Sequence, residues 1–251
     1  MNIAAGIAML EIQAVIMGNP NVIHPTLLWN EERVVLVDTG YPGQLPLIQT
    51  AMNEARHSLE TITDIIITHQ DIDHIGSLPM LLDHVRPRPA VWASELEQPY
   101  IQGERLLIKV TPEGVDRAIA SLPPSVSEET RRAFRHTLLN PPHAPVDRLI
   151  GYGQAEAPID GLIVVDTPGH TPGHISLYHQ ASKTLIAGDA LVIQDGQLQL
   201  ANVNTNYDHA RALRSIRALC ELDISGVICY HGGYYQDGAR ARILELVAEG
   251  E

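Results

Sequence analysis

Positive charge is scarce in this sequence, and none of it is concentrated. The 251 residues include 17 Lys and Arg against 30 Asp and Glu, which gives a formal net charge of −13, and the longest basic run is the pair Arg131 and Arg132. Proteins that bind nucleic acid or anionic lipid usually collect Lys and Arg on one surface. We therefore expect no nucleic-acid partner and no membrane partner, and we expect a small-molecule substrate instead.

Cysteine and long apolar runs are scarce too. Two cysteines, Cys220 and Cys229, are too few for a disulfide framework, and we interpret them as reduced thiols in the core. Residues 1–17 contain Glu11 and Gln13, lack the positive region of a secretory signal and are too short to span a membrane. These absences favour a cytoplasmic location. A homodimer is a common assembly and stays open, because the sequence does not reveal oligomeric state.

The composition is that of a globular protein. Hydrophobic residues make up 45% of the chain and charged residues 19%, which argues against disorder and against a coiled coil. The length suits one larger α/β domain or two small ones. Short apolar runs predict buried strands at residues 34–37, 64–68, 162–166, 175–178, 183–187 and 226–230. Apolar stripes of helical spacing predict helices at residues 45–57, 74–84 and 209–220.

Residues 95–160, approximately, differ from both flanks. This range is rich in proline and predicts helices at 111–122 and 127–139. We interpret it as an inserted helical subdomain or lid that lies outside the sheet. The two flanking halves could pack as two sheets face to face with helices outside, although periodicity alone does not determine that topology.

The densest polar cluster follows the predicted strand 64–68. His69, Asp71, Asp73 and His74 offer two imidazoles and two carboxylates within six residues. These are the nitrogen and oxygen ligands of zinc and of other first-row divalent ions. The competing interpretation is a solvated turn in which one aspartate caps a helix. That role would leave both histidines unexplained, so we favour a metal site.

Three other predicted strands also end in a possible ligand beside glycine. They end at Gly169-His170, at Gly188-Asp189 and at His231-Gly232. Glycine would let the backbone approach an ion or a substrate closely, because it has no Cβ. Four such strand ends in one chain favour a single shared site.

These motifs resemble those of the metallo-β-lactamase superfamily. Residues 68–74 resemble its His-x-His-x-Asp-His signature, and residues 167–174 resemble its Thr-Pro-Gly-His-Thr-x-Gly-His segment. Gly188-Asp189 resembles the segment of its bridging aspartate, and residues 230–232 resemble that of its final histidine. The motifs occur in the family's order, and the resemblance extends from residue 34 to residue 233 apart from the insert. It implies an α/β (α+β) fold, a four-layer αββα sandwich of two mixed β-sheets flanked by helices, in a single domain 1–251 with a helical insert at about 95–160.

The resemblance also implies a ligand set for two divalent metal ions. The first ion would be held by His69, Asp71 and His170. The second ion would be held by Asp73, His74 and His231, with Asp189 as the bridge between the two ions. Asp38 and His174 would support the ligands from behind through hydrogen bonds, without binding metal themselves.

One position departs from the family pattern and bears on the choice of metal. Asp71 stands where the family usually has its second histidine. Zn²⁺ is the expected ion at both positions, but the extra carboxylate moves the preference of the first position toward iron or manganese. The flavodiiron branch also carries a carboxylate there, yet this chain has no flavin-binding domain, which argues against oxygen reduction.

The expected activity is hydrolysis of a carboxylic ester, lactone or thioester of a small molecule. A hydroxide that bridges the two ions would attack the carbonyl carbon. Asp189 would hold the bridge and Asp73 would move a proton to the leaving group, so we expect both to be catalytic. Tyr207, Tyr234 and Tyr235 flank the last ligand segments and are candidates for substrate contact.

The sequence does not identify the substrate. A lactonase of this family would have a tyrosine shortly after the bridging aspartate, whereas Ala190 and Leu191 follow Asp189 here. A thioesterase of the glyoxalase type would have a basic C-terminal extension, whereas only residues 232–251 follow His231 here. Two other function classes stay open, an iron-dependent oxidoreductase of the same fold and a metal-binding protein without turnover.

Overall fold

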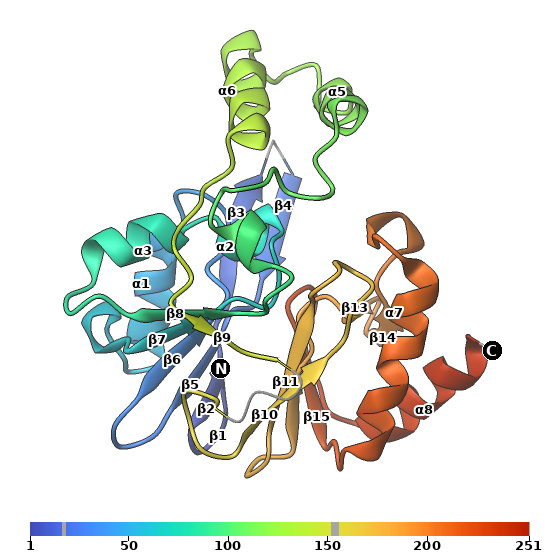
Figure 1. Cartoon of the computed structure of the whole chain (residues 1–251). Helices are drawn as coiled ribbons and strands as arrows, with labels where there is room; N and C mark the ends of the chain where they lie inside the picture. The colour runs from blue at the N-terminus through green and yellow to red at the C-terminus, as the bar shows by residue number, and fades with distance from the viewer. Residues whose placement is uncertain (17–18, 152–155, 251) are drawn as a thin grey trace.

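The apolar runs form strands that pair into two β-sheets, and the sheets face each other (Figure 1). The structure is a computed structural model that describes residues 1–16, 19–151 and 156–250. Within these residues the first sheet has the strand order β1 (Asn2–Ala4), β2 (Ile7–Met9), β5 (Thr26–Trp29), β6 (Val34–Val37), β7 (Asp64–Ile66), β8 (Ala90–Ala93) and β9 (Arg148–Leu149). The strands from β6 to β9 run parallel and the others antiparallel. The residues that follow β6, β7 and β8 therefore meet at one edge of this sheet.

The second sheet is mixed as well. Its described strands are β10 (Leu162–Asp166), β11 (Ile175–His179), β12 (Thr184–Ile186), β15 (Gly226–Cys229) and β16 (Gly233–Tyr235). Only β12 and β15 pair in parallel, so the residues after these two strands share an edge. Two hairpins flank the sheets, β3 (Ile12–Ile16) with β4 (Asn19–Ile23), and β13 (Leu191–Gln194) with β14 (Gln197–Leu200). A β-bridge between Ile23 and His231 joins the first hairpin to the end of the second sheet.

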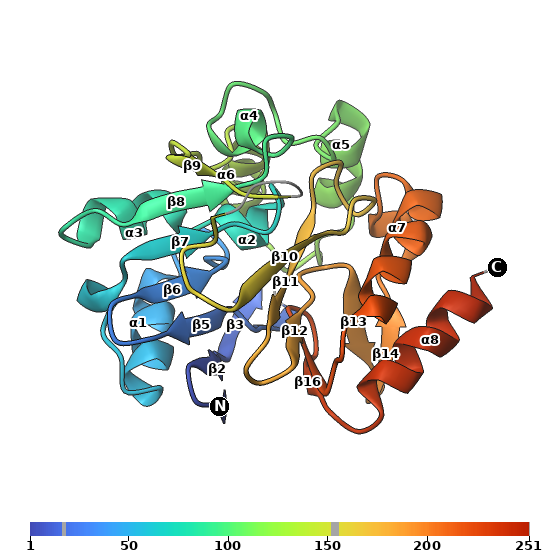
Figure 2. The ribbon, with the colours of Figure 1, turned by 60° about the horizontal axis from the view of Figure 1, so that its bottom comes forward.

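Helices cover the outer faces of both sheets (Figures 1 and 2). The first sheet is covered by α1 (Leu45–Glu54), η1 (Leu59–Thr61), α2 (Ile72–Ile75) and α3 (Leu78–His84). The second sheet is covered by α7 (His209–Ser215), η3 (Ile216–Glu221) and α8 (Ala239–Glu249), and η2 (Val203–Thr205) precedes α7. The αββα sandwich implied by the sequence is confirmed.

Strand alternation builds separate cores on the two faces of each sheet. In β6, Leu36 points toward the helices, whereas Val35 and Val37 point into the core between the sheets. All three side chains are almost fully buried. A strand buried on both faces needs apolar residues throughout, which explains the continuous apolar runs in the sequence.

Two predicted helices are interrupted. The range 74–84 forms two helices, because Pro79 has no N–H for a bond to the carbonyl of Ile75 and is tolerated only in the first turn of α3. The range 209–220 begins as α7 and continues as the tighter helix η3. Both differences arise in single turns that a periodicity of apolar residues does not resolve.

The range 95–160 is helical over much of its length, as expected. It contains α4 (Gln98–Ile101), α5 (Pro112–Ala120) and α6 (Glu128–Leu139), and α5 and α6 stand beside each other away from the sandwich (Figure 1). The guanidinium of Arg131 joins them by donating to the carbonyls of Ile119 and Leu122 at 2.9 and 3.1 Å. The expectation that the whole range lies outside the sheet is wrong, because β9 pairs with β8; a two-residue strand has no periodicity to detect.

Both cysteines are free thiols, with Cys229 buried and Cys220 half-buried. No helix among the described residues is both long and apolar enough to cross a membrane.

The contribution of the core between the first sheet and its helices to the free energy of unfolding can be measured at Leu36. This side chain is fully buried, so Leu36→Ala should lower the free energy of unfolding by about 2–5 kcal/mol in urea denaturation of the chelator-treated protein. Leu244 is 45% exposed on α8, and Leu244→Ala is the matched control, expected to change the same free energy by less than about 0.5 kcal/mol. Equal effects of the two variants would contradict this account of the core.

Candidate metal centre

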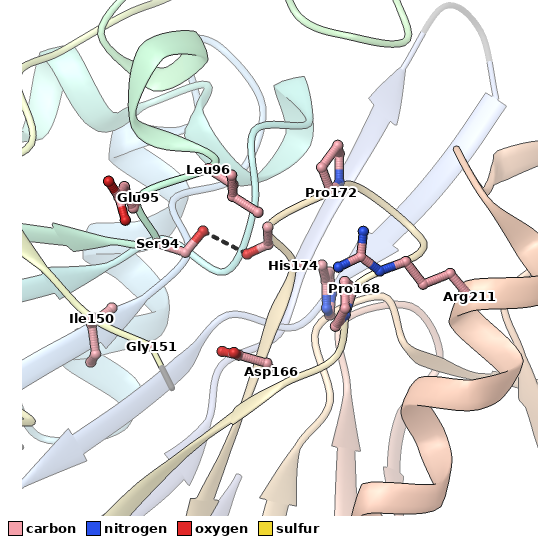
Figure 3. Close-up of a pocket in the computed structure, with 11 residues that line it drawn as sticks. Ser94, Glu95, Leu96, Ile150, Gly151, Asp166, Pro168, Pro172, His174 and Arg211 are labelled. Atoms are coloured by element: carbon pink, nitrogen blue, oxygen red, sulfur yellow. Dashed lines mark hydrogen bonds between the residues drawn. The ribbon is translucent and has the colours of Figure 1, made fainter. Parts of the chain in front are cut away.

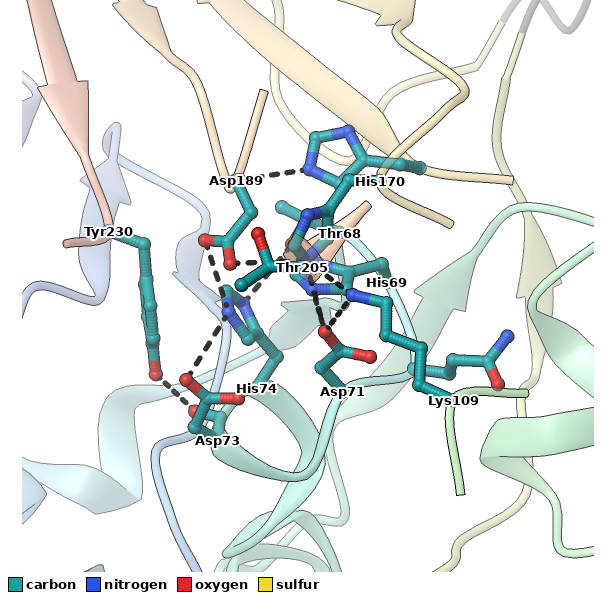
Figure 4. A network of polar contacts seen from close by, with 12 residues as sticks. Thr68, His69, Asp71, Asp73, His74, Lys109, His170, Asp189, Thr205 and Tyr230 are labelled. Carbon is teal, nitrogen blue, oxygen red and sulfur yellow. Dashed lines mark hydrogen bonds and ion pairs between the residues drawn. The ribbon is translucent and has the colours of Figure 1, made fainter. Parts of the chain in front are cut away.

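The ends of strands from both sheets converge on one cluster of histidines and aspartates. His69 and Asp71 lie in the loop after β7, and Asp73 and His74 lie in α2. His170 lies in the turn between β10 and β11, Asp189 follows β12, and His231 follows β15. The structure thus brings together all the side chains predicted to bind metal. Figure 4 labels all of them except His231.

The cluster divides into two groups of potential ligand atoms. The groups are His69, Asp71, His170 and Asp189, and then Asp73, His74 and His231, with the ligand atoms of each group within 4.8 Å of one another. The carboxylate of Asp189 also reaches the second group. Its Oδ2 lies 3.2 Å from His170 Nε2, and its Oδ1 lies 3.4 Å from His74 Nε2. This position between the groups is the one expected of a bridging carboxylate.

Several buried polar atoms in the cluster have no hydrogen-bond partner among the described residues. They are His69 Nε2, His74 Nε2 and Asp189 Oδ1. Carboxylate oxygens lie 3.3–3.4 Å from the two nitrogens, but without the geometry of a hydrogen bond. Buried polar atoms are nearly always paired, and an imidazole nitrogen with a free lone pair is a zinc ligand. The residues therefore fit divalent metal ions at both groups.

Asp38 holds the loop after β7 and orients His74. Its carboxylate accepts hydrogen bonds from Thr68 N and Thr68 Oγ1, each at 2.8 Å. Oδ2 also lies 2.9 Å from His74 Nδ1, which assigns the proton of this imidazole to Nδ1 and leaves Nε2 free to face the cluster. The Tyr230 ring lies against His74 with 3.8 Å between centroids, and its hydroxyl donates to the carbonyl of Asp73.

His174 lies behind the cluster with both ring nitrogens engaged. Nδ1 lies 2.8 Å from Thr167 Oγ1, and Nε2 accepts a hydrogen bond from the backbone N–H of Asp189 at 2.9 Å. The acceptor role requires an unprotonated Nε2. Gly188 permits this approach, since a Cβ there would lie 2.7 Å from that nitrogen.

The buried charges shift one another's pKa values. Burial lowers the pKa of His74, but the carboxylates of Asp38 and Asp189 outweigh it and raise that pKa well above 6.5. Burial and the adjacent His74 lower the pKa of His69 to about 4, so this imidazole is neutral at pH 7. Burial opposes ionisation of Asp71, yet His69 and other neighbours hold its pKa well below 3.8. The cluster therefore contains an ionised Asp71 and a neutral His69, as metal binding requires, whereas an ion bound at His74 would displace a proton from its Nε2.

Sequence reasoning missed the residues that reach the site from the insert. Lys109 Nζ lies 2.5 Å from Asp71 Oδ2 and 2.7 Å from His170 Nε2. Glu97 is fully buried and accepts hydrogen bonds from Gln70 N, from Gln70 Nε2 and from Gly173 N. No motif or spacing in the sequence marks these residues, which reach the ligand loops only through the fold.

The three tyrosines proposed as substrate contacts are placed differently from one another. Tyr207 is 59% exposed, and its backbone N–H donates to the carbonyl of His170 at 3.1 Å. Tyr234 packs against the core between the sheets, with its hydroxyl over Gly226 at the far end of β15. Tyr235 packs under the helices on the opposite face. Tyr234 and Tyr235 are partly buried against these two clusters, and substrate contact by either one stays a prediction.

A cavity of about 210 Å³ is lined in part by the turn between β10 and β11, through Pro168 and Pro172 (Figure 3). His174, Asp166 and Arg211 are among its lining residues, and Ser94 Oγ donates to Gly173 O at 2.6 Å beside it. None of the predicted ligands lines this cavity. We therefore locate the candidate site at the cluster of ligand atoms that lack hydrogen-bond partners, and not in the cavity.

Comparison with known proteins agrees with this geometry. Residues 18–231 match the family model described as the Metallo-beta-lactamase superfamily. The probable metallo-hydrolase YflN of Bacillus subtilis is 28% identical over 212 residues, which cover 79% of this chain and 75% of that protein. The hydroxyacylglutathione hydrolase GloC of Haemophilus influenzae is 23% identical over 220 residues, which cover 86% and 89%. A metallo-beta-lactamase family protein from Thermus thermophilus shares the fold, with a TM-score of 0.66 at 24% identity over 98% of this chain and 79% of that chain.

The role of Asp38 can be tested by metal binding. In Asp38→Asn, an amide replaces one carboxylate oxygen and sets an N–H₂ donor against Thr68 or His74. We expect Zn²⁺ to bind about 10–100-fold more weakly, measured by competition with a chromophoric chelator. Asp160→Asn, at an exposed position, is the control and should bind as the wild type does. Unchanged binding by Asp38→Asn would rule out the orienting role.

The neutral state of His174 predicts a pH dependence of stability. Burial, and then His69 and His170, hold the pKa of His174 well below 6.5. The stability that this neutral side chain contributes is complete above pH 6.5 and decreases by about 1.4 kcal/mol for each pH unit below it, because only the unfolded chain takes up the proton there. In metal-free protein, His174→Asn should therefore destabilise less at pH 5.5 than at pH 7.5 in urea denaturation. A difference in unfolding free energy that stays constant between the two pH values would contradict a neutral His174.

Proposed function

Because the chain belongs to the metallo-beta-lactamase superfamily, we propose that it is a dinuclear metallo-hydrolase that cleaves a carboxylic ester, lactone or thioester of a small molecule. The observation that carries this proposal is the convergence of bare, buried ligand atoms on both sides of Asp189. Relatives are named metallo-hydrolases, and one is named a hydroxyacylglutathione hydrolase, which supports an acyl compound as substrate.

The two groups would hold one divalent ion each, with Asp189 shared between them. When bound, such ions would lower the pKa of a coordinated water to about 7 and would polarise a carbonyl oxygen, which is the chemistry that hydrolysis at neutral pH needs. The first group contains the carboxylates of Asp71 and Asp189, and the second group contains that of Asp73. We propose Zn²⁺ at both positions, with iron or manganese as the alternative at the position of Asp71.

The side chains around the ions differ in exposure, which indicates where a substrate would enter. The side chain of His231 is 32% exposed, that of Asp71 20% and that of Asp73 15%, whereas His69 and His74 are fully buried. The open side of the cluster is therefore the side of Asp71, Asp73 and His231. We propose Tyr207 as a substrate contact, because its side chain is exposed and its backbone N–H donates to the carbonyl of His170.

Asp73 lies on that open side and is suited to proton transfer. Its Oδ2 lies 3.2 Å from His231 Nε2, while the Tyr230 hydroxyl holds its backbone carbonyl in place. We propose that Asp73 accepts a proton released on attack and delivers it to the leaving oxygen or sulfur. Asp189 is less exposed and keeps the two groups at a set separation.

The charge of the whole chain supports a small-molecule substrate over nucleic acid. A cytoplasmic location and association as a homodimer stay predictions.

Metal content and hydrolysis measured together test the proposal. Protein purified without added metal and then reconstituted should hold about two divalent ions per chain and hydrolyse at least one class in a panel of esters, lactones and thioesters. His69→Ala should lose one ion and lower the rate by more than about 100-fold, because a ligand and its ion are both lost. His84→Ala, at an exposed position on α3, should change neither quantity.

Two other results would replace the proposal. Bound iron with oxygen consumption and no hydrolysis would indicate the oxidoreductase. Full metal content with no turnover on any substrate in the panel would indicate a metal-binding protein.

A further inference from the structure

Lys109 reaches from the insert into the ring of ligands for the first ion. It precedes α5, and its side chain is 26% exposed. Its Nζ lies 2.5 Å from Asp71 Oδ2 and 2.7 Å from His170 Nε2 (Figure 4). The same Asp71 oxygen lies 3.3 Å from His69 Nε2. The ammonium therefore contacts two of the three side chains that the first ion would use and lies beside the third.

The ammonium and a metal ion would use the same lone pair of His170. The Nδ1 atom of His170 lies 3.1 Å from Asn206 Oδ1. An amide oxygen is an acceptor, so Nδ1 carries the proton and Nε2 carries the lone pair. Nε2 lies 2.7 Å from Lys109 Nζ and also 3.0 Å from Asp71 Oδ2, and because an ammonium can only donate, the contact with Lys109 uses that lone pair. A protonated lysine has donors and no lone pair of its own, so it cannot remain there and also bind the ion.

A buried network places Lys109 in this position. The backbone N–H of Ile108 donates to Gln70 Oε1 at 2.6 Å. Gln70 stands between His69 and Asp71 in the sequence, and its Nε2 donates to Glu97 Oε2 at 2.8 Å. Gln70 and Glu97 are both fully buried. The residue before Lys109 is thus tied to the loop that carries the first ligands, which distinguishes Lys109 from a surface lysine that folds back by chance.

We propose that Lys109 is an internal competitor for the first metal ion. The inference rests on the proposed dinuclear site and concerns how that site fills. A divalent cation that binds His69, Asp71 and His170 displaces the ammonium toward solvent, so the first position holds its ion more weakly than its ligands alone would. The second position, at Asp73, His74 and His231, lies outside the contacts of Lys109 and fills first.

Zn²⁺ binding measures this competition directly. Lys109→Met keeps the unbranched shape of the side chain, one atom shorter, and removes its charge, so the dissociation constant of the weaker Zn²⁺ should fall at least about tenfold, measured with a chromophoric chelator. The dissociation constant of the tighter Zn²⁺ should not change. Lys183→Met is the matched control, because Lys183 forms an exposed ion pair with Asp223 at 2.6 Å, and it should leave both constants unchanged.

Chemical labelling of the wild-type protein provides a second readout without any variant. Lys109 and Lys183 are the only lysines in the sequence, so the two sites are easily separated by mass spectrometry after reaction with an amine-specific reagent. Addition of Zn²⁺ should increase the labelling rate of Lys109 several-fold. The rate at Lys183 should stay constant and serves as the reference within the same molecule.

The outcomes separate this inference from the proposed function. Two Zn²⁺ ions bound with the same constants in wild type and Lys109→Met, with Lys109 labelling unaffected by Zn²⁺, would overturn the inference and leave the hydrolase intact. A single Zn²⁺ in the wild type and two in Lys109→Met would support the inference in its strongest form. No Zn²⁺ bound by either protein would overturn both the dinuclear site and the competition.

Discussion

The carboxylates of Asp71, Asp73 and Asp189 lie close together and largely below the surface, and like charges in such a place repel unless positive charge compensates them. Burial adds to the cost, because each ionised group loses water. His74, whose pKa is raised by Asp38, Asp189 and Asp73 against the effect of burial, and Lys109 supply positive charge from the protein itself. Divalent ions would supply more. The residues around the three carboxylates hold this positive charge in place without a change in the fold.

The two ligand groups are supported in different ways. His74 is held by Asp38 on one edge and by the Tyr230 ring on one face, all from residues at the ends of sheet strands. The first group depends partly on the insert, through Glu97, which accepts hydrogen bonds from Gln70, and through Lys109. Sheet strands are rigid, whereas a lysine can leave its position by rotating its side chain. The second group is therefore preformed, and the first group can exchange one cation for another.

This division gives the insert a role in the proposed reaction. It lies next to the open side of the cluster through Lys109, and it is joined to the turn of His170 by the hydrogen bond from Gly173 N to Glu97 Oε1 at 2.7 Å. A segment that contacts ligand loops from both sheets can influence metal affinity without contributing a metal ligand. The sandwich supplies the hydrolytic site, and the insert adjusts it.

The sequence by itself indicated the candidate ligands and the strands, because both are encoded locally, and the sandwich followed from the resemblance to the family and not from residue periodicity. Apolar runs marked the strands, and four of these strands ended in a residue such as His69 or Asp189 whose type already indicated metal binding. Only the tertiary structure decided what surrounds them. Lys109 is 38 residues from Asp71 and has no neighbouring pattern, so its contact exists only after the insert folds back. The register of β16 sends Tyr234 and Tyr235 to opposite faces of the second sheet and away from the cluster. Side-chain direction of this kind follows from strand pairing, which residue spacing alone does not specify.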